Sequence, residues 1–233
     1  MKVTLVDVMG TDLTVVNAAR VSFNKVSDWE ETRWCTKEGG YHKVDYICSK
    51  CICYDDVLHR ELKTGDIKLI KYLAKHKHWT PFAHPQIQLH VKAPIFVARQ
   101  LIKHQVGLVW NEVSRRYVDY EPEFYYPEKW RGRAVDKKQG SAGELPKAHQ
   151  EATNIDFREA ETYCLKAYNV AILRGIAPEQ ARIILPLNTY TEWYWTIDLH
   201  NLFHFLRLRV DPHAHKEIRV YGEVIAKMVK AVC

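Results

Sequence analysis

The sequence lacks a long apolar run. No window of its 233 residues approaches the roughly 18 consecutive apolar residues that a membrane-spanning helix requires. Residues 1–7 carry an acid where a secretory signal peptide needs an apolar stretch. We therefore expect a soluble, cytoplasmic protein with no membrane partner.

Several motifs that indicate a particular chemistry are absent as well. The chain has no G-x-G-x-x-G and no Walker A sequence, which argues against a dinucleotide held in a Rossmann crevice. It has no G-x-S-x-G elbow, Ser114 has no obvious base beside it, and no cysteine stands in a Pro-Cys context suited to attack on a pyrimidine. Phosphate binding must then come from side chains and loop amides, and no enzyme nucleophile is evident.

The charge that is present is mildly basic. The net charge is +6, from 34 Lys and Arg against 28 Asp and Glu. Such an excess suits anionic ligands such as nucleotides, folates or nucleic acid without choosing among them. The cations are spread along the chain rather than gathered in a tail, which weighs against a nucleic-acid-binding arm.

Four of the six cysteines, Cys35, Cys48, Cys51 and Cys53, fall in one short segment. Clustering of this kind in a cytosolic chain favours thiols or a metal over disulfides. The Cys48–Cys51 pair with Cys35 could hold zinc, with His42 or Cys53 as the fourth ligand. The second paired half of a zinc module is missing, so we predict reduced cysteines and no metal, with zinc as the alternative.

Hydrophobic patterning predicts one α+β domain over residues 1–233, with a twisted, mostly antiparallel sheet packed with long helices. Two excursions interrupt it: a Cys-containing insertion at about 24–65, with only a short helix near 54–62, and a loop at about 119–146. Asp66 and Asp198 are expected to cap helices. The expected strands cover 3–8, 87–91 and 191–197, and the expected helices cover 14–19, 66–75, 147–174, 199–209 and 213–229.

The segment 99–117 gathers cations, amides, a His, a Glu and a Ser between large apolar residues. A helix running from Pro94 would place Gln100, Lys103 and His104 on one face. Gly107 then ends the helix, and residues 111–116 are expected to form a loop. Cations beside neutral donors suit a phosphorylated small molecule, although a solvated helix face and a surface turn would show the same pattern.

Together with other segments, this region resembles the flavin-dependent thymidylate synthases over most of the chain. The resemblance covers some 200 residues in one order. Its segments are Val6-Asp7-Val8-Met9-Gly10, Ala18-Ala19-Arg20-Val21-Ser22-Phe23, His78-Trp79-Thr80-Pro81-Phe82-Ala83-His84, His90 to Gln100, Asn111-Glu112-Val113-Ser114, Ala181-Arg182-Ile183-Ile184-Leu185-Pro186-Leu187-Asn188, and Leu208-Arg209 with Asp211, His213 and Ala214.

The resemblance implies reductive methylation of dUMP to dTMP. Methylenetetrahydrofolate would be the carbon donor and NADPH the reductant, with bound FAD between them. Reduced flavin then supplies the hydride, so no enzyme nucleophile is needed and the protein provides orientation and electrostatics. The resemblance also implies a homotetramer in which residues from several chains share each site.

Site residues follow from the same resemblance. Arg209 would be the catalytic residue, because a cation beside the uracil ring favours its ionised form. Arg116 and Arg182 would meet the phosphate through their forked donors. The dUMP contacts would be Gln100, Lys103, Glu112, Ser114, Arg115, Arg116, Arg182 and Arg209. The FAD contacts would be Ser22, His78, Thr80, Lys103, His104, Gln105, Glu112, Asp198, Leu199, His200, His204 and His213.

The sequence departs from the family pattern in several places. Lys103-His104-Gln105 replaces the family's Arg-His-Arg triplet, and one extra residue separates it from Ser114. Asp198, His200 and His204 stand where the family tends to have Asn, Arg and Asn. Two alternatives follow: a nucleotide-binding relative that has lost flavin or activity, or a nucleic-acid-binding protein with a zinc-like Cys module.

Overall fold

The computed structural model describes residues 2–37, 40–44, 56–118, 120–135 and 140–232, and within 32–59 it describes the backbone alone. The contacts divide the chain into two compact units. We call Met1–Val8 with Ile87–Val232 the sheet unit, and Met9–Gln86 the N-terminal unit. Each is described by itself.

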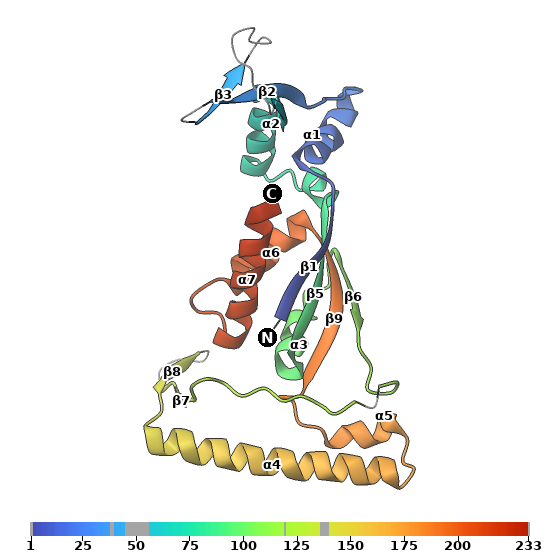
Figure 1. Ribbon diagram of the computed structural model, residues 1–233, viewed down its shortest axis with the longest axis vertical. Helices are drawn as coiled ribbons and strands as arrows, with labels where there is room; N and C mark the ends of the chain where they lie inside the picture. Colours follow the sequence, from blue (N-terminus) through green and yellow to red (C-terminus); the bar gives the residue numbers. More distant parts are fainter. Residues whose placement is uncertain (1, 38–39, 45–55, 119, 136–139, 233) are drawn as a thin grey trace. The chain divides into compact units, whose positions relative to one another are not determined.

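The sheet unit is built on four strands in the order β1-β5-β9-β6 (Figure 1). These are β1 (Lys2–Met9), β5 (Gln86–Pro94), β6 (Leu108–Glu112) and β9 (Tyr190–Asp198). Strands β6 and β9 pair antiparallel, from Leu108 opposite Ile197 to Glu112 opposite Trp193. The predicted α+β class with an antiparallel sheet is confirmed.

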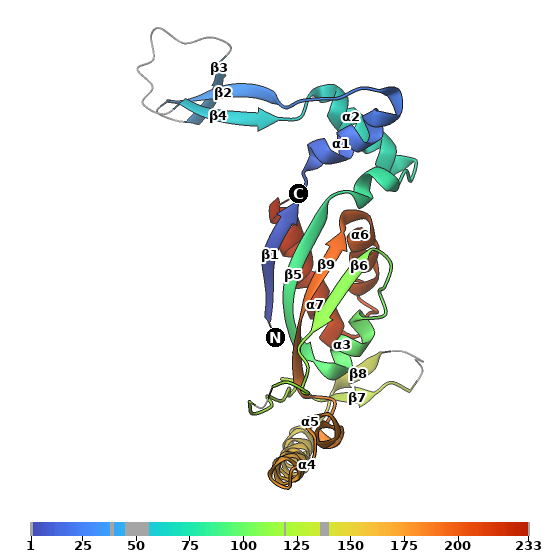
Figure 2. The same ribbon diagram turned by 90° about the vertical axis from the view of Figure 1, so that its right-hand side faces the viewer.

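Three helices cover one face of this sheet: α3 (Ile95–Leu101), α6 (Leu199–Arg209) and α7 (Lys216–Val232) (Figures 1 and 2). Every second residue of β9 points into that layer, and Trp193 and Trp195 are at most 1% exposed. Phe205 of α6 and Ile225 of α7 are fully buried. Each such side chain contributes roughly 1.5–3 kcal/mol to folding, so this layer holds the ends of α3 and α6 in place.

The rest of the sheet unit comprises β7 (Arg131–Arg133), β8 (Ser141–Glu144), α4 (Lys147–Leu173), α5 (Pro178–Ala181) and the 3₁₀ helix η3 (Arg182–Ile184). Helix α4 is tied to the preceding segment at Trp130, whose backbone N–H donates to Gln150 (2.7 Å) and whose indole donates to Asn154 (2.7 Å). Gly175 follows with φ +80°, as expected for a residue that ends a helix. No helix in the described parts of the chain is long and apolar enough to cross a bilayer.

In its described residues, the N-terminal unit contains two helices, two 3₁₀ helices and a three-stranded sheet in the order β3-β2-β4. Its elements are α1 (Asp12–Arg20), η1 (Val21–Phe23), β2 (Glu30–Lys37), β3 (Gly40–Val44), β4 (Asp56–Glu61), α2 (Thr64–Lys75) and η2 (Thr80–Ala83).

The structure corrects the sequence prediction in the insertion. Residues 54–62 were expected to be helical, but Asp56–Glu61 form strand β4, which pairs with β2 from Glu30 opposite Glu61 to Cys35 opposite Asp56. Strand pairing with a segment distant in the sequence overrides the local pattern. The expectation of little regular structure there was also wrong, because three strands occupy the region.

Four further predictions of element boundaries differ from the structure. Lys63, not Asp66, is the N-cap of α2, and Asp66 lies fully buried in the first turn. Helix α3 ends at Leu101, so Lys103 and His104 stand in the following turn and not on the helix face with Gln100. The predicted loop at 111–116 begins inside strand β6, and the 119–146 loop contains β7 and β8.

Candidate active site

Three of the predicted site residues, Gln100, Arg209 and His213, line one cavity of about 530 Å³. Gln100 comes from the last turn of α3, Arg209 ends α6, and His213 lies in the turn before α7. The other described lining residues are Gly140, Arg207, Leu208, Asp211, Ala214 and His215. The cavity therefore combines two guanidinium groups, two imidazoles and one carboxylate.

Arg209 is held by His104 across this unit. The Nε–H of Arg209 donates to Nε2 of His104 over 2.9 Å. Burial, followed by the charge of Arg209 and the proximity of His204, lowers the pKa of His104 to about 4. His104 is therefore neutral near pH 7, as an acceptor from a guanidinium must be. Since this bond uses only one of the five N–H groups of Arg209, the rest of the fork can serve a ligand.

Packing fixes both partners of this bond. The ring of His104 meets Phe205 edge-on at a centroid distance of 5.1 Å, and Phe205 meets Trp195 in the same way at 5.1 Å. Behind Arg209, helix α7 approaches so closely that a Cβ at Gly222 would stand 3.1 Å from the carbonyl carbon of Arg209. Glycine at this position allows the two helices to approach this closely, because a larger residue would require them to shift by a few tenths of an ångström.

The start of α6 is held by a second close approach. Asp198 caps the helix by accepting from the backbone N–H of Asn201 (2.9 Å), and the side-chain amide of Asn201 donates to its other oxygen (2.7 Å). Gly107, at φ +68°, lies so near that an added Cβ would be 1.7 Å from Oδ2 of Asp198. The predicted cap is confirmed. The carboxylate of Asp198 is thus engaged in the fold, and Leu199 beside it is only 7% exposed.

The end of strand β6 carries Glu112 in a defined position. Thr191 on the neighbouring strand donates to its Oε1 over 2.6 Å, and the indole of Trp110 donates to its Oε2 over 3.1 Å. Trp110 stacks on Trp193 with ring centroids 4.1 Å apart. Both oxygens of Glu112 accept hydrogen bonds, so the orientation of its carboxylate is fixed by the two neighbouring side chains.

The turn after β6 and the 3₁₀ helix η3 supply three cations, of which Arg116 and Arg182 are exposed and Arg115 is half-buried. Arg116 donates from Nε and from its backbone N–H to Oγ of Ser114 (3.2 and 3.3 Å). Arg115 donates to the carbonyl of Tyr120 and lies over that ring, 4.5 Å from its centroid. Arg182 is exposed and donates from Nε to the carbonyl of Glu179 over 3.3 Å.

The remaining predicted residues are dispersed. Glu112, Ser114, Arg116 and Arg182 are not among the described residues that line the Arg209 cavity. Lys103 and Gln105 are exposed in the turn after α3. On α6, His200 is half-buried, and exposed His204 lies 3.2 Å from Arg207 through Nδ1. Three residues belong to the N-terminal unit instead: Ser22 on η1, His78 after α2, and Thr80 on η2.

The cysteine cluster falls largely outside the part of the chain that the structure describes. Cys48, Cys51 and Cys53 lie outside the described residues, and only the backbone of Cys35 is described, opposite His42 on β3. Within the described residues, no group of three or more His, Cys, Asp or Glu side chains could hold a metal ion.

The sequence reasoning missed two features that hold the site. Gly107 was expected to end the helix from Pro94, but that helix ends at Leu101, and the close approach of Gly107 to Asp198 was not foreseen. Gly222 was not considered. A glycine inside an otherwise regular helix, as in α7, is the signal that could have found it.

Fold and cavity together define an α+β protein with a site suited to a small anionic ligand. Residues 4–233 match the family model described as thymidylate synthase complementing protein, and the chain belongs to that family.

Named relatives agree with this assignment. The flavin-dependent thymidylate synthase from one strain of Thermus thermophilus is 43% identical over 228 residues, covering 98% of this chain and 71% of the relative. The protein of the same name from Treponema denticola is 42% identical, covering 98% and 74%. Among solved structures, the UMP/dUMP methylase PolB from Streptomyces cacaoi, bound with 5-Br UMP, matches with a TM-score of 0.74 and 28% identity, covering 99% of this chain and 89% of that one.

Proposed function

We propose that this chain is a flavin-dependent thymidylate synthase, which methylates dUMP to dTMP with FAD as cofactor. The observation that carries the proposal is the convergence of Gln100 and Arg209 on one cavity in a chain that matches the family over residues 4–233.

Arg209 is the residue we assign to catalysis. Its guanidinium stands at a half-buried position and is oriented by neutral His104, so its charge is less screened than that of a surface arginine. A cation so placed beside a pyrimidine stabilises the ionised ring and raises the electron density at the carbon that accepts the methyl group. Gln100, in the same cavity, can donate to and accept from the ring amide edge.

Four cations supply the phosphate contacts in this proposal. Arg116 and Arg182 have forked donors that match a phosphate, and Lys103 and Arg115 add charge. Ser114 offers a hydroxyl already oriented toward Arg116. Glu112, held by Thr191 and Trp110, accepts a hydrogen bond from the substrate or the flavin. These residues reach the cavity of Arg209 if several chains share one site.

The chemistry of the side chains near α6 fits FAD. The pyrophosphate of FAD is anionic and needs hydrogen-bond donors, which are supplied here by Lys103, Gln105, His200, His204 and Arg207. The carboxylate of Asp198, the N-cap of α6, is already bonded to Asn201. With Ser22, His78, Thr80, His104, Leu199 and His213, these residues would hold the cofactor. When bound and reduced, FAD supplies the reducing equivalent that completes the methyl group.

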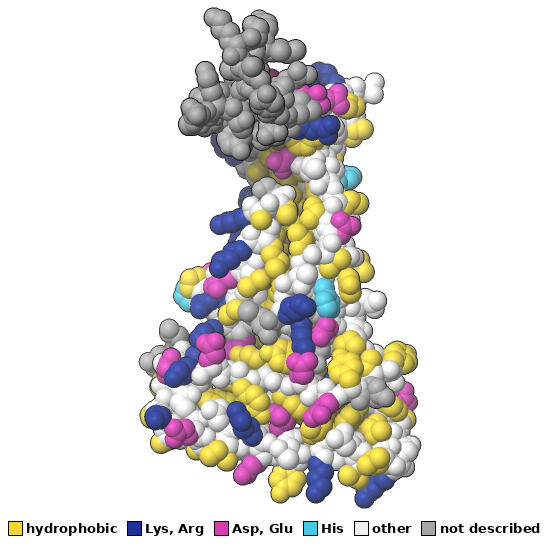
Figure 3. All heavy atoms as spheres, viewed as in Figure 1, with side chains coloured by type: hydrophobic (Ala, Val, Ile, Leu, Met, Phe, Trp, Pro, Cys, Tyr) yellow, Lys and Arg dark blue, Asp and Glu magenta, His cyan; other side chains and the backbone are white. Residues whose placement is uncertain are grey.

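Methylenetetrahydrofolate as carbon donor, NADPH as reductant, a cytoplasmic location and a homotetramer belong to the same proposal. Exposed apolar surface supports self-association. Figure 3 shows apolar side chains gathered over α4 and α5, and this region exposes Leu173 (86%) and Ile183 (81%). On the sheet, Val109 (69%) and Tyr194 (49%) are exposed as well.

A flavin titration tests the proposal. The purified protein should bind FAD and show a flavin absorption spectrum, which NADPH should bleach under anaerobic conditions. The bleached enzyme should be reoxidised when dUMP and methylenetetrahydrofolate are added together, with UMP as the comparison substrate. A protein that stays colourless after FAD is added, and forms no dTMP, would instead be the nucleotide-binding relative that Lys103 and Gln105 suggest.

A further inference from the structure

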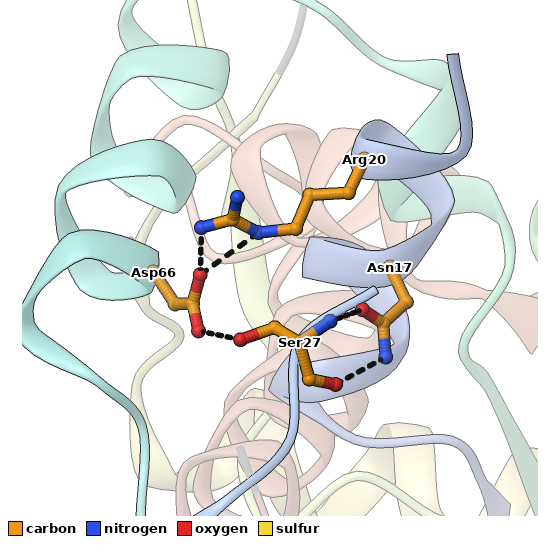
Figure 4. Close-up of polar contacts among 4 residues, drawn as sticks. All are labelled: Asn17, Arg20, Ser27 and Asp66. Carbon is orange, nitrogen blue, oxygen red and sulfur yellow. Dashed lines mark hydrogen bonds and ion pairs between the residues drawn. The ribbon is translucent and has the colours of Figure 1, made fainter. Parts of the chain in front are cut away.

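Asp66 is a fully buried carboxylate that the proposed reaction does not use. Its Oδ1 accepts from Nε of Arg20 over 3.0 Å and from Nη2 of the same residue. Its Oδ2 accepts from the hydroxyl of Ser27. Figure 4 shows these contacts between the start of α2, the end of α1 and the chain that follows η1.

The two partners of Asp66 stand at the two ends of one short segment, which we call the 21–26 loop. Arg20 precedes the loop and Ser27 follows it. Asn17 reinforces the second end, because its side chain accepts from the backbone N–H of Ser27 (2.7 Å) and donates to the carbonyl of Ser27 (3.0 Å). One carboxylate thus fastens both ends of the loop to α2.

The 21–26 loop itself is closed by its own backbone. The N–H of Asn24 donates to the carbonyl of Val21 (2.9 Å), and that of Lys25 donates to the carbonyl of Arg20 (3.2 Å). Its side chains point outward: Val21 is 70% exposed, Phe23 77% and Val26 79%. Because these side chains bury little surface, packing contributes little to holding the loop, and the polar contacts at its ends must do so.

The charge on Asp66 suits this task. Burial by itself would raise its pKa, but the hydrogen bonds from Ser27 and Arg20, the charge of Arg20 and the charge of Lys63 together lower it. The carboxylate is therefore ionised throughout the neutral range and pairs with Arg20, whose side chain is 29% exposed. A loop fastened in this way is held in one position before any ligand arrives.

We propose that Asp66 is a positioning residue: with Arg20 and Ser27 it fixes the 21–26 loop so that Ser22 is presented to the flavin. This inference rests on the proposed function, in which Ser22, His78 and Thr80 of the N-terminal unit contact the flavin. Of these three residues, Ser22 is the one that lies within the 21–26 loop. Asp66 touches neither substrate nor cofactor and acts through the loop.

Hydrogen exchange tests the fastening without any ligand. In Asp66→Asn, the amide that replaces one carboxylate oxygen can no longer accept, and the charge that pairs with Arg20 is gone. Exchange of the backbone amides of residues 21–27 should accelerate about tenfold or more. Ser27→Ala removes only the hydroxyl and leaves the backbone contacts with Asn17, so it should give a smaller acceleration and keeps the test informative if Asp66→Asn folds poorly. Asp28→Asn, the same change at an exposed neighbour, is the matched control.

Flavin affinity tests the positioning. Well below the melting temperature, where each variant is fully folded, Asp66→Asn should raise the Kd for FAD about tenfold and leave the Kd for dUMP unchanged. Saturating FAD should restore kcat, as expected when a variant is impaired in flavin affinity and not in the chemical step.

The outcomes separate the two claims. Unchanged exchange at residues 21–27 in both Asp66→Asn and Ser27→Ala overturns the fastening, whatever the flavin does. Faster exchange with wild-type FAD affinity overturns the positioning role. If the wild-type protein itself binds no FAD, the proposed function fails and the positioning role fails with it, while the exchange result still decides the fastening.

Discussion

Charged residues are used in opposite ways in two regions of this molecule. In the N-terminal unit, Asp66 is fully buried and bonded to Arg20 and Ser27. In the sheet unit, Arg115, Arg116 and Arg182 are solvent-accessible and bond within a few residues of themselves. Buried charges require nearly complete pairing, whereas exposed cations contribute little to stability and can turn to a ligand. The first group should therefore control stability, and the second should control substrate binding. Arg209 is intermediate, because it is half-buried and bonded to His104 but also lines the cavity.

Arg209→Ala should have the largest effect on activity. Removing a preorganised cation from a half-buried site should lower kcat for dUMP methylation by about 100- to 1,000-fold. Flavin content should stay near the wild-type value, because the proposed flavin contacts remain. Arg209→Lys is the control that keeps the charge but loses the Nε bond to His104. Its kcat should lie between that of the wild type and that of Arg209→Ala. Turnover near the wild-type rate in Arg209→Ala would refute the catalytic role.

Asp66→Asn should have the largest effect on stability. Leaving Arg20 without its buried partner should lower the free energy of unfolding by about 3 kcal/mol, measured by chemical denaturation. The pKa of Asp66 is lowered in the folded state, so its stabilisation is present above its ordinary pKa of 3.8 and is lost as the pH falls through the lower folded value. The variant should lack that acid-dependent loss. Equal stability of variant and wild type would contradict the contrast drawn above.

Arg182→Ala should affect binding without affecting stability. Its guanidinium is exposed and donates only one described bond, to the carbonyl of Glu179, so the melting temperature should shift little. Loss of a phosphate contact should raise KM for dUMP about tenfold with a smaller change in kcat. Arg174→Ala, at the C-terminus of α4, is the control that removes a cation with no assigned contact. A large fall in the melting temperature of Arg182→Ala would place Arg182 with the structural charges instead.

His104→Gln should give the smallest of these effects. We expect it as a change in how the free energy of unfolding depends on pH. The pKa of His104 falls from 6.5 to about 4 on folding, so the unfolded chain binds more protons between these values and stability should decline as pH falls through this window. Replacing His104 by an amide that does not titrate should remove that decline, a change within about 1 kcal/mol after screening. His149→Gln, at an exposed position on α4, should leave the decline intact.

Regular periodicity made the main elements of the sheet unit predictable. The alternation in β5 and β9 and the capping of α6 by Asp198 are local signals that the final fold keeps. The convergence of Gln100, Arg209 and His213 came from the family resemblance, since nothing local joins α3 to the end of α6. The helix expected from Pro94 extended too far, because the chain turns at Ile102 before Lys103 and His104.

The rest depended on contacts distant in the sequence. Strand β4 forms because it pairs with β2, and its local pattern allowed a helix equally well. An acid near a helix start is an ordinary capping signal, yet the partner of Asp66 is Arg20, 46 residues earlier. The glycines at 107 and 222 matter because of what approaches them, Asp198 and Arg209, which no local pattern reveals.

The most direct test of the central claim is product formation by the flavin-loaded protein. Incubation with dUMP, methylenetetrahydrofolate and NADPH, followed by chromatographic separation of the nucleotides, should yield dTMP in many turnovers per flavin, and Arg209→Ala run in parallel should yield almost none. Flavin-loaded wild-type protein that bleaches with NADPH and still forms no dTMP would contradict the account.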